Sequence, residues 1–234
     1  MLFGGQDQNG NALDDTWTWD GASWKQLRPS VSPGPRGRAR MAFDSKRDEV
    51  ILYGGFGTGP GDIPYDTWTW DGTTWSKVSV AQTPGAPADT HLGGSMAFDE
   101  ATSTAVLYGG CVNAPPSPPT YTFDGRTWSS HPVHGPPGTC GPAMAYDGGS
   151  HDIVLFGGNS GSSAQAETWV WDGASWTQKA PATSPPARTF AFMAYDAGRR
   201  EVVLFGGFVT SQAGVTSTAS DTWAWNGAAW TRLA

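Results

Sequence analysis

Short apolar runs alternate along the whole chain with clusters of Gly, Pro and Asp. A representative run is Val50-Ile51-Leu52-Tyr53, which is rich in β-branched and aromatic residues and ends at Gly54-Gly55. Segments of this length and composition, bounded by turn residues, are typical of β-strands. The pattern therefore predicts many short strands joined by tight turns.

Three phrases recur in a fixed order. Met-Ala-aromatic-Asp occupies residues 41–44, 96–99, 144–147 and 193–196. Leu-aromatic-Gly-Gly occupies residues 2–5, 52–55, 107–110, 155–158 and 204–207. The third phrase, Thr-Trp-x-Trp-Asp-Gly-x-x-Trp or a close variant, occupies residues 16–24, 67–75, 120–128, 168–176 and 222–230. A period of about 50 residues indicates a repeat fold, here with four strands in each unit.

Two of the connections in each unit have a constant length. The Met of the first phrase and the Leu of the second are equally spaced in every copy, at 41 and 52, 96 and 107, 144 and 155, and 193 and 204. The first aromatic of the third phrase and its last Trp are also equally spaced, at 17 and 24, 68 and 75, 121 and 128, 169 and 176, and 223 and 230. Constant lengths predict hairpins between strands 1 and 2 and between strands 3 and 4, the latter closed by an Asp-Gly turn.

The other two connections vary in length. The second Gly and the first aromatic of the third phrase lie at 5 and 17, 55 and 68, 110 and 121, 158 and 169, and 207 and 223. The last Trp and the next Met lie at 24 and 41, 75 and 96, 128 and 144, and 176 and 193. In a four-stranded antiparallel meander these 2–3 and 4–1 connections emerge on the same side. Because binding residues usually lie on variable loops of a rigid scaffold, we expect the ligand on this face.

The Gly-Gly pair after strand 2, the aromatic residue in strand 3 and the Trp in strand 4 resemble the kelch repeat. The resemblance covers essentially the whole chain and implies one all-β domain, residues 1–234, folded as a β-propeller of five four-stranded blades. The blade units are approximately residues 1–28, 36–80, 91–133, 139–180 and 188–234. The paired Trp residues of strand 3 then pack one blade against the next.

The first unit begins at Leu2 without the Met-Ala-aromatic-Asp phrase, so its blade is expected to lack the innermost strand. An unpaired strand edge is costly unless it is covered or solvated. We therefore expect a longer native polypeptide, a strand donated by another copy, or a tolerated three-stranded blade.

Composition excludes some partners. The chain has 14 basic and 21 acidic residues, a net charge of -7 and no basic stripe, which disfavours nucleic acid. No apolar run approaches the roughly 20 residues that cross a bilayer, so no membrane partner is expected. The 13 Trp residues make a disordered chain untenable.

The channel mouth is predicted from the residues just before each strand 1. Five positions before each Met lie Arg36, His91, Thr139 and Arg188, a polar set suited to an anionic or hydroxylated ligand. The structural alternative for the two arginines is that they bridge blade carbonyl groups. Acidic residues before strand 3, which form either a calcium ring or turn caps, are Asp15, Asp66, Glu167 and Asp221.

Cysteine and histidine gather around the third unit. Cys111 and Cys140 are candidates for a disulfide that joins neighbouring blades, and this fits an extracellular or periplasmic protein. His131 and His134 are weak metal candidates because their spacing matches no zinc signature. Independent, unlinked residues are the third possibility, and no cofactor is expected.

No P-loop, nucleophile elbow or His-Glu-x-x-His motif occurs in the sequence. We therefore expect a non-enzymatic propeller that binds a protein or carbohydrate ligand. The first alternative is a small-molecule enzyme, a lyase or sugar isomerase, that uses His91 or His134 as an acid–base group at the channel mouth. The second alternative is a structural protein that self-associates by strand donation into the incomplete first blade.

Overall fold

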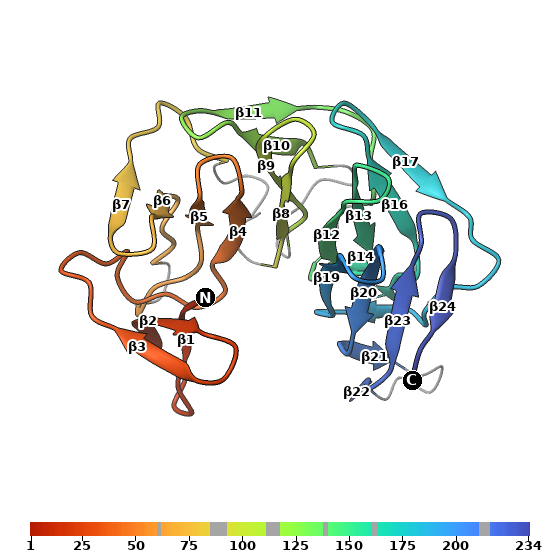
Figure 1. Cartoon of the computed structure of the whole chain (residues 1–234), viewed down its shortest axis with the longest axis horizontal. Helices are drawn as coiled ribbons and strands as arrows, with labels where there is room; N and C mark the ends of the chain where they lie inside the picture. Colours follow the sequence, from red (N-terminus) through yellow and green to blue (C-terminus); the bar gives the residue numbers. More distant parts are fainter. Residues whose placement is uncertain (60–61, 85–92, 111–117, 138–139, 161–162, 211–215) are drawn as a thin grey trace.

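The computed structural model of the chain describes residues 1–59, 62–84, 93–110, 118–137, 140–160, 163–210 and 216–234. Within these ranges the regular secondary structure consists of β-strands. The described residues contain no candidate for a membrane-spanning helix. Most of the described strands belong to five antiparallel sheets that stand side by side in an open arc (Figure 1).

The sheets follow one another in chain order. The first sheet has three strands: β1 (Leu2–Gln6), β2 (Ala12–Trp19) and β3 (Trp24–Leu27). The second comprises β4 (Arg40–Asp44), β5 (Glu49–Tyr53), β6 (Thr67–Trp70) and β7 (Trp75–Val78). The third comprises β8 (Ser95–Asp99), β9 (Thr104–Tyr108), β10 (Thr120–Phe123) and β11 (Trp128–His131).

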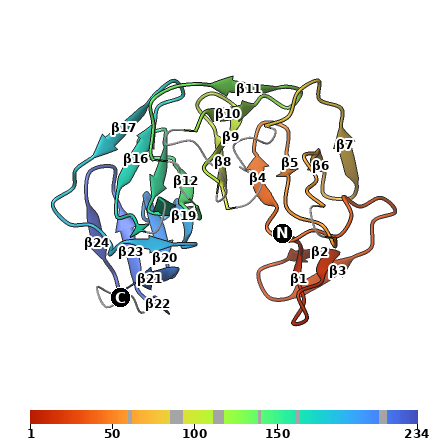
Figure 2. The same cartoon turned by 180° about the vertical axis from the view of Figure 1, so that it is seen from behind.

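The fourth sheet comprises β12 (Ala143–Asp147), β13 (Asp152–Phe156), β16 (Thr168–Trp171) and β17 (Trp176–Lys179). The fifth comprises β19 (Phe192–Asp196), β20 (Glu201–Phe205), β23 (Thr222–Trp225) and β24 (Trp230–Arg232). Short strands in the connections are β14 (Asn159–Ser160), β15 (Ser163–Ala164), β18 (Arg188–Thr189), β21 (Phe208–Thr210) and β22 (Thr216–Thr218). The inner strands β4, β8, β12 and β19 lie next to one another around the inside of the arc (Figure 2).

Strand pairing explains the constant spacings of the sequence. Each Met of the first phrase is paired directly with the Leu of the second, as Met41 with Leu52 and Met193 with Leu204. The last two aromatic residues of the third phrase are also paired, as Trp70 with Trp75. A change in either spacing would shift the register and turn the apolar side chains to the wrong face of the sheet.

The predicted turn between strands 3 and 4 is confirmed. In the second sheet Gly72 has φ of 95°, a left-handed conformation that suits glycine. The carboxylate of Asp71 accepts hydrogen bonds from the backbone N–H groups of Thr73 at 2.8 Å and Thr74 at 2.7 Å. These bonds lower the pKa of Asp71 and keep the turn tight.

Tryptophan side chains join each sheet to the sheet before it. The ring of Trp75 is buried and lies 4.9 Å from the ring of Phe3, centroid to centroid, across the first joint. Its indole N–H donates to the hydroxyl of Thr16 at 3.1 Å. The paired tryptophans of strand 3, Trp68 and Trp70, are buried in the same apolar cluster as Phe3, so the packing role predicted for them is confirmed at this joint.

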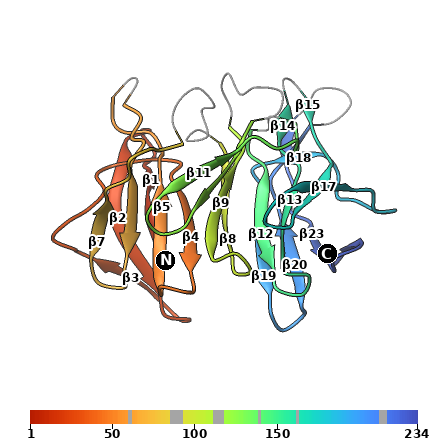
Figure 3. The same ribbon diagram turned by 90° about the horizontal axis from the view of Figure 1, so that it is seen from above.

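The three-stranded first sheet agrees with the prediction that the first unit lacks an innermost strand, because β1 is an edge strand among the described residues. Figure 3 shows that β14, β15 and β18 lie on one side of the arc, where the 2–3 and 4–1 connections run. Connections of variable length therefore gather on one face, which we call the loop face.

Candidate functional site

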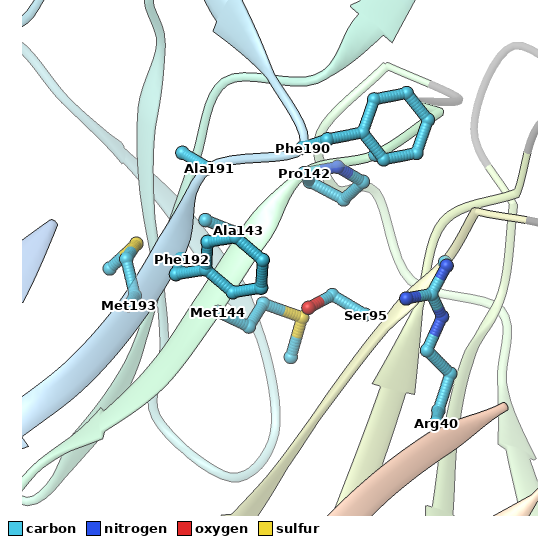
Figure 4. A pocket seen from close by; sticks show the side chains of 11 residues that line it. Arg40, Ser95, Pro142, Ala143, Met144, Phe190, Ala191, Phe192 and Met193 are labelled. Carbon is cyan, nitrogen blue, oxygen red and sulfur yellow. The ribbon is translucent and has the colours of Figure 1, made fainter. Parts of the chain in front are cut away.

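A hollow of about 260 Å³ opens where the inner strands begin on the loop face (Figure 4). Four residues at equivalent positions take part in its lining, each directly before a repeated Met: Arg40, Ser95, Ala143 and Phe192. They come from the first positions of β4, β8, β12 and β19. The repeat therefore places four chemically different side chains around one point.

Arg40 is the polar group that dominates this hollow. Its Nε is buried and has no hydrogen-bond partner, and no ion pair to its guanidinium occurs in the part of the chain that the structure describes. Burial and, after it, the positive charge of Arg38 lower the pKa of Arg40 to about 10. At neutral pH the group is still protonated, so it is a partly desolvated cation without a counter-ion among the described residues.

The remaining walls are mostly apolar. Phe192 is 76% exposed, and Met144 lies beside it in the hollow (Figure 4). Ser95 adds a hydroxyl group between Arg40 and the apolar side. None of the described lining residues is acidic. The arrangement suits a ligand that pairs an anionic or strongly polar group with an apolar surface.

Arg36 does not line this hollow, because its backbone belongs to the joint between the first and second sheets. The Arg36 N–H donates to the carbonyl of Leu13 at 2.9 Å, and Gly37 forms a bridge with Phe56. The chain turns toward the inner strand only at Arg38, which has φ of 55°. In this connection Arg40, directly before Met41, lines the hollow, whereas Arg36, five positions before Met41, does not.

The side chains of Arg36 and Arg188 are buried in ion pairs. Arg36 Nη1 lies 2.7 Å from Asp66 Oδ1 and also donates to the carbonyl of Gly54. Arg188 donates to both carboxylate oxygens of Asp221, at 2.7 and 2.9 Å, and to the carbonyl of Gly206. The contacts match the structural alternative for these arginines and leave little of either guanidinium for a ligand.

The partner carboxylates are held by a second donor from strand 3. The indole of Trp68 donates to Asp66 at 2.9 Å, and that of Trp223 donates to Asp221 at 2.8 Å. Corresponding bonds join Trp17 to Asp15 and Trp169 to Glu167. The acidic residues before strand 3 are therefore tied to tryptophans of their own sheets, as structural caps.

The Asp221 pair should make stability depend on pH. Hydrogen bonds from Arg188, and then from Trp223, lower the pKa of Asp221 to about 2, from 3.8. A folded-state pKa below the unfolded value stabilises the fold above about pH 5, and this contribution disappears as pH falls toward 2. We expect a loss of about 2 kcal/mol over that interval, measured by urea unfolding.

The matched control is Asp221→Asn, which removes the titrating group. The difference in unfolding free energy between the native chain and this variant should shrink as the pH falls from 5 to 2. A difference that stays constant across this interval would contradict the assignment.

Of the remaining predicted residues, the structure describes only Cys140 and the two histidines of the third unit. His91, Thr139 and Cys111 lie outside the described residues. Cys140 is disulfide-bonded, and its backbone pairs with Asn159 in an isolated bridge. The pairing of Cys140 with Cys111 stays a prediction.

The two histidines of the weak metal prediction face tryptophans of the fourth sheet. His131 Nε2 lies 2.8 Å from the hydroxyl of Thr122, and its ring centroid lies 6.1 Å from that of Trp171. The ring of His134 lies 6.2 Å from Trp169. Among the described residues no group of three or more His, Cys, Asp or Glu side chains is arranged to hold a metal ion.

Antiparallel sheets that stand side by side with their inner strands around a common centre define a β-propeller fold. A solved structure, that of YjhT, is similar to the chain with a TM-score of 0.69 and 16% sequence identity. The match covers 99% of this chain and 82% of that chain, and it supports the fold alone.

Sequence comparisons add little. No family model matches the chain, so membership of the kelch family stays a prediction. The tRNA wybutosine-synthesizing protein 4 of Aspergillus fumigatus is 29% identical over 114 residues, which is 47% of this chain. The match spans only 10% of that protein's length.

Proposed function

We propose that this chain is a non-enzymatic binding propeller whose five blades, the first without its innermost strand, present a ligand site on the loop face. The ligand is a protein or carbohydrate that carries an anionic group. Arg40 contacts this group, while Phe192 and Met144 contact an adjoining apolar surface.

The observation that supports this proposal is that Arg40 lines the hollow while its guanidinium has no ion pair among the described residues and its Nε has no hydrogen-bond partner. A buried polar group without a partner is destabilising, and a buried charge without a partner more so. The buried arginines Arg36 and Arg188 are instead paired with carboxylates and carbonyl groups. A chain that satisfies two arginines in this way and leaves Arg40 open has a cation available for an external anion.

The lining favours binding over catalysis. No imidazole, carboxylate or thiol that could exchange a proton near neutral pH belongs to the described lining of the hollow. His134, one candidate acid–base group, is exposed beside Trp169 and is not part of this lining. The enzyme alternative therefore depends on His91, outside the described residues.

Calorimetric titration with matched pairs of probes tests the proposal. Glucuronate is compared with glucose, and a short acidic peptide is compared with its neutral amide form. We expect the anionic member of one pair to bind and Arg40→Met to weaken that binding about 10- to 100-fold, because hydrogen bonds to charged groups contribute about 1.5–3 kcal/mol.

The control is Arg199→Met, which removes an exposed arginine from a hairpin between strands 1 and 2, away from the loop face. This variant should bind the anionic probe as tightly as the native chain does. Equal binding of neutral and anionic probes, or binding that is insensitive to Arg40→Met, would contradict the proposed contact.

We also propose an extracellular or periplasmic location, because the bonded state of Cys140 suits an oxidising compartment. Thiol alkylation of the chain isolated from its native source provides the test. Labelling of Cys140 without prior reduction would argue for a reducing compartment.

A further inference from the structure

Every joint between neighbouring sheets has the same two halves. The half contributed by the earlier sheet, which we call its front face, includes Ile51 and Tyr53 in the second sheet. The half contributed by the later sheet, its back face, includes Leu107 and Trp128 in the third sheet. The same halves meet in the other apolar clusters, so the chain uses one joint repeatedly.

A hydrogen bond marks each joint. The last Trp of a sheet donates from its indole N–H to the hydroxyl of the Thr that opens strand 3 of the sheet before it. The four pairs and their distances are Trp75 with Thr16 at 3.1 Å, Trp128 with Thr67 at 2.9 Å, Trp176 with Thr120 at 2.7 Å and Trp230 with Thr168 at 2.9 Å. The halves are therefore complementary in polarity as well as in shape.

The back face of the first sheet has no sheet against it. Trp24 corresponds to Trp75, yet it is 51% exposed where Trp75 is 1% exposed. Leu2 and Trp19 are also exposed, although their equivalents in the second sheet are buried. The indole N–H of Trp24 has no hydrogen-bond acceptor among the residues that the structure describes.

The front face of the fifth sheet is open in the same way. Phe205 is 51% exposed, whereas its equivalents Tyr53, Tyr108 and Phe156 are buried. Thr222 corresponds to the four Thr acceptors, and within the described part of the chain its hydroxyl receives no indole N–H. The two unmatched faces belong to the first and last sheets, at the two ends of the arc (Figure 1).

We propose that one further four-stranded sheet of the same repeat docks between these ends. Its back face would pack against Phe205 and donate an indole N–H to Thr222. Its front face would cover Leu2 and Trp19 and offer a Thr hydroxyl to Trp24. The occupant is identified by the four joints within the chain, which show what covers each of these faces when it is buried.

The size of the similar solved structure supports a single sheet. The match with YjhT covers 99% of this chain but only 82% of that longer chain, and the remainder has about the length of one repeat. A second whole copy of this chain is a poorer occupant, because each of its end sheets already has one face packed against the neighbouring sheet of its own arc. One sheet with two complementary faces satisfies both ends at once.

The experiment extends the full chain by one repeat. A copy of residues 29–80 is joined after Ala234, so that the interval from Trp230 to the next Met equals the native interval from Trp24 to Met41. Both chains carry 5-fluorotryptophan, and Trp24→Phe assigns the Trp24 signal in the fluorine NMR spectrum. We expect the solvent isotope shift of that signal to be present in the native chain and lost in the extended chain.

The matched control carries Asp in the added repeat in place of its Leu52 and Trp75 equivalents, and it should leave the Trp24 signal solvent-exposed. If the extended chain does not fold, a copy of residues 29–105 joined ahead of Met1 keeps the native interval from Trp75 to Leu107 in front of Leu2. It brings the same repeat to this position from the other end and should protect Trp24 equally. A folded extended chain with an exposed Trp24 signal overturns the proposal. So does light scattering that shows the native chain as a dimer with Trp24 already protected, since a second copy is then the occupant.

Discussion

Replacing Trp75 by Ala is expected to lower the free energy of unfolding by about 3–5 kcal/mol, whereas the same change at Trp24 should cost less than about 1 kcal/mol. Both residues close strand-3 to strand-4 hairpins in the same sequence phrase. They differ in their surroundings, because Trp75 packs between Phe3 and Trp70 and Trp24 has no sheet against its outer side.

Urea unfolding of the two variants and the native chain provides the measurement. Trp75→Phe is a useful intermediate because it retains an aromatic ring but loses the indole N–H that donates to Thr16. We expect it to fall between the native chain and Trp75→Ala. Equal losses from Trp75→Ala and Trp24→Ala would mean that the joint between sheets contributes little beyond the hairpin itself.

Arg188→Met is expected to destabilise the chain by about 3–5 kcal/mol, because it leaves the Asp221 carboxylate partly buried without its cation. The guanidinium of Arg188 joins that carboxylate to the carbonyl of Gly206 and lies at the joint of the fourth and fifth sheets. The backbone carbonyl of Arg188 accepts a hydrogen bond from the N–H of Gly158 at 2.9 Å, so Arg188 connects both sheets through its backbone and its side chain.

The double variant Arg188→Met with Asp221→Leu tests whether the loss in stability comes from the unpaired carboxylate. Removing both charges should recover a large part of the loss, since an apolar pair avoids the cost of a lone buried charge. The control is Arg199→Met, whose exposed pair with Glu201 spans 3.4 Å and should contribute less than about 1 kcal/mol. A double variant as unstable as the single one would contradict this interpretation.

Much of the fold follows from spacing alone. The constant interval from Met41 to Leu52 predicts a hairpin, and in the structure the two residues are paired directly. Local pairing of this kind depends on residues close in sequence, so a repeated interval is enough to establish it. The missing strand of the first sheet was predictable for the same reason, from the absence of one phrase before Leu2.

The site was less predictable because it depends on how the 4–1 connections end. Counting back from the repeated Met identifies Arg36, but a backbone bridge between Gly37 and Phe56 holds that part of the chain in a joint. The useful signal was the variation in the residue directly before the Met, where Arg40 and Phe192 occupy equivalent positions. That Arg40 lacks a counter-ion, unlike the other buried arginines, can be recognised only when the partners of all of them are known.

Each tryptophan hydrogen bond between sheets runs from a sheet to its predecessor, which gives the assembly a direction. A unit inserted or deleted at any joint would present the same donor on one side and the same acceptor on the other. Duplication or deletion of a repeat can therefore lengthen or shorten such a chain without a change in any contact between sheets, while the residue that opens each inner strand remains free to diverge.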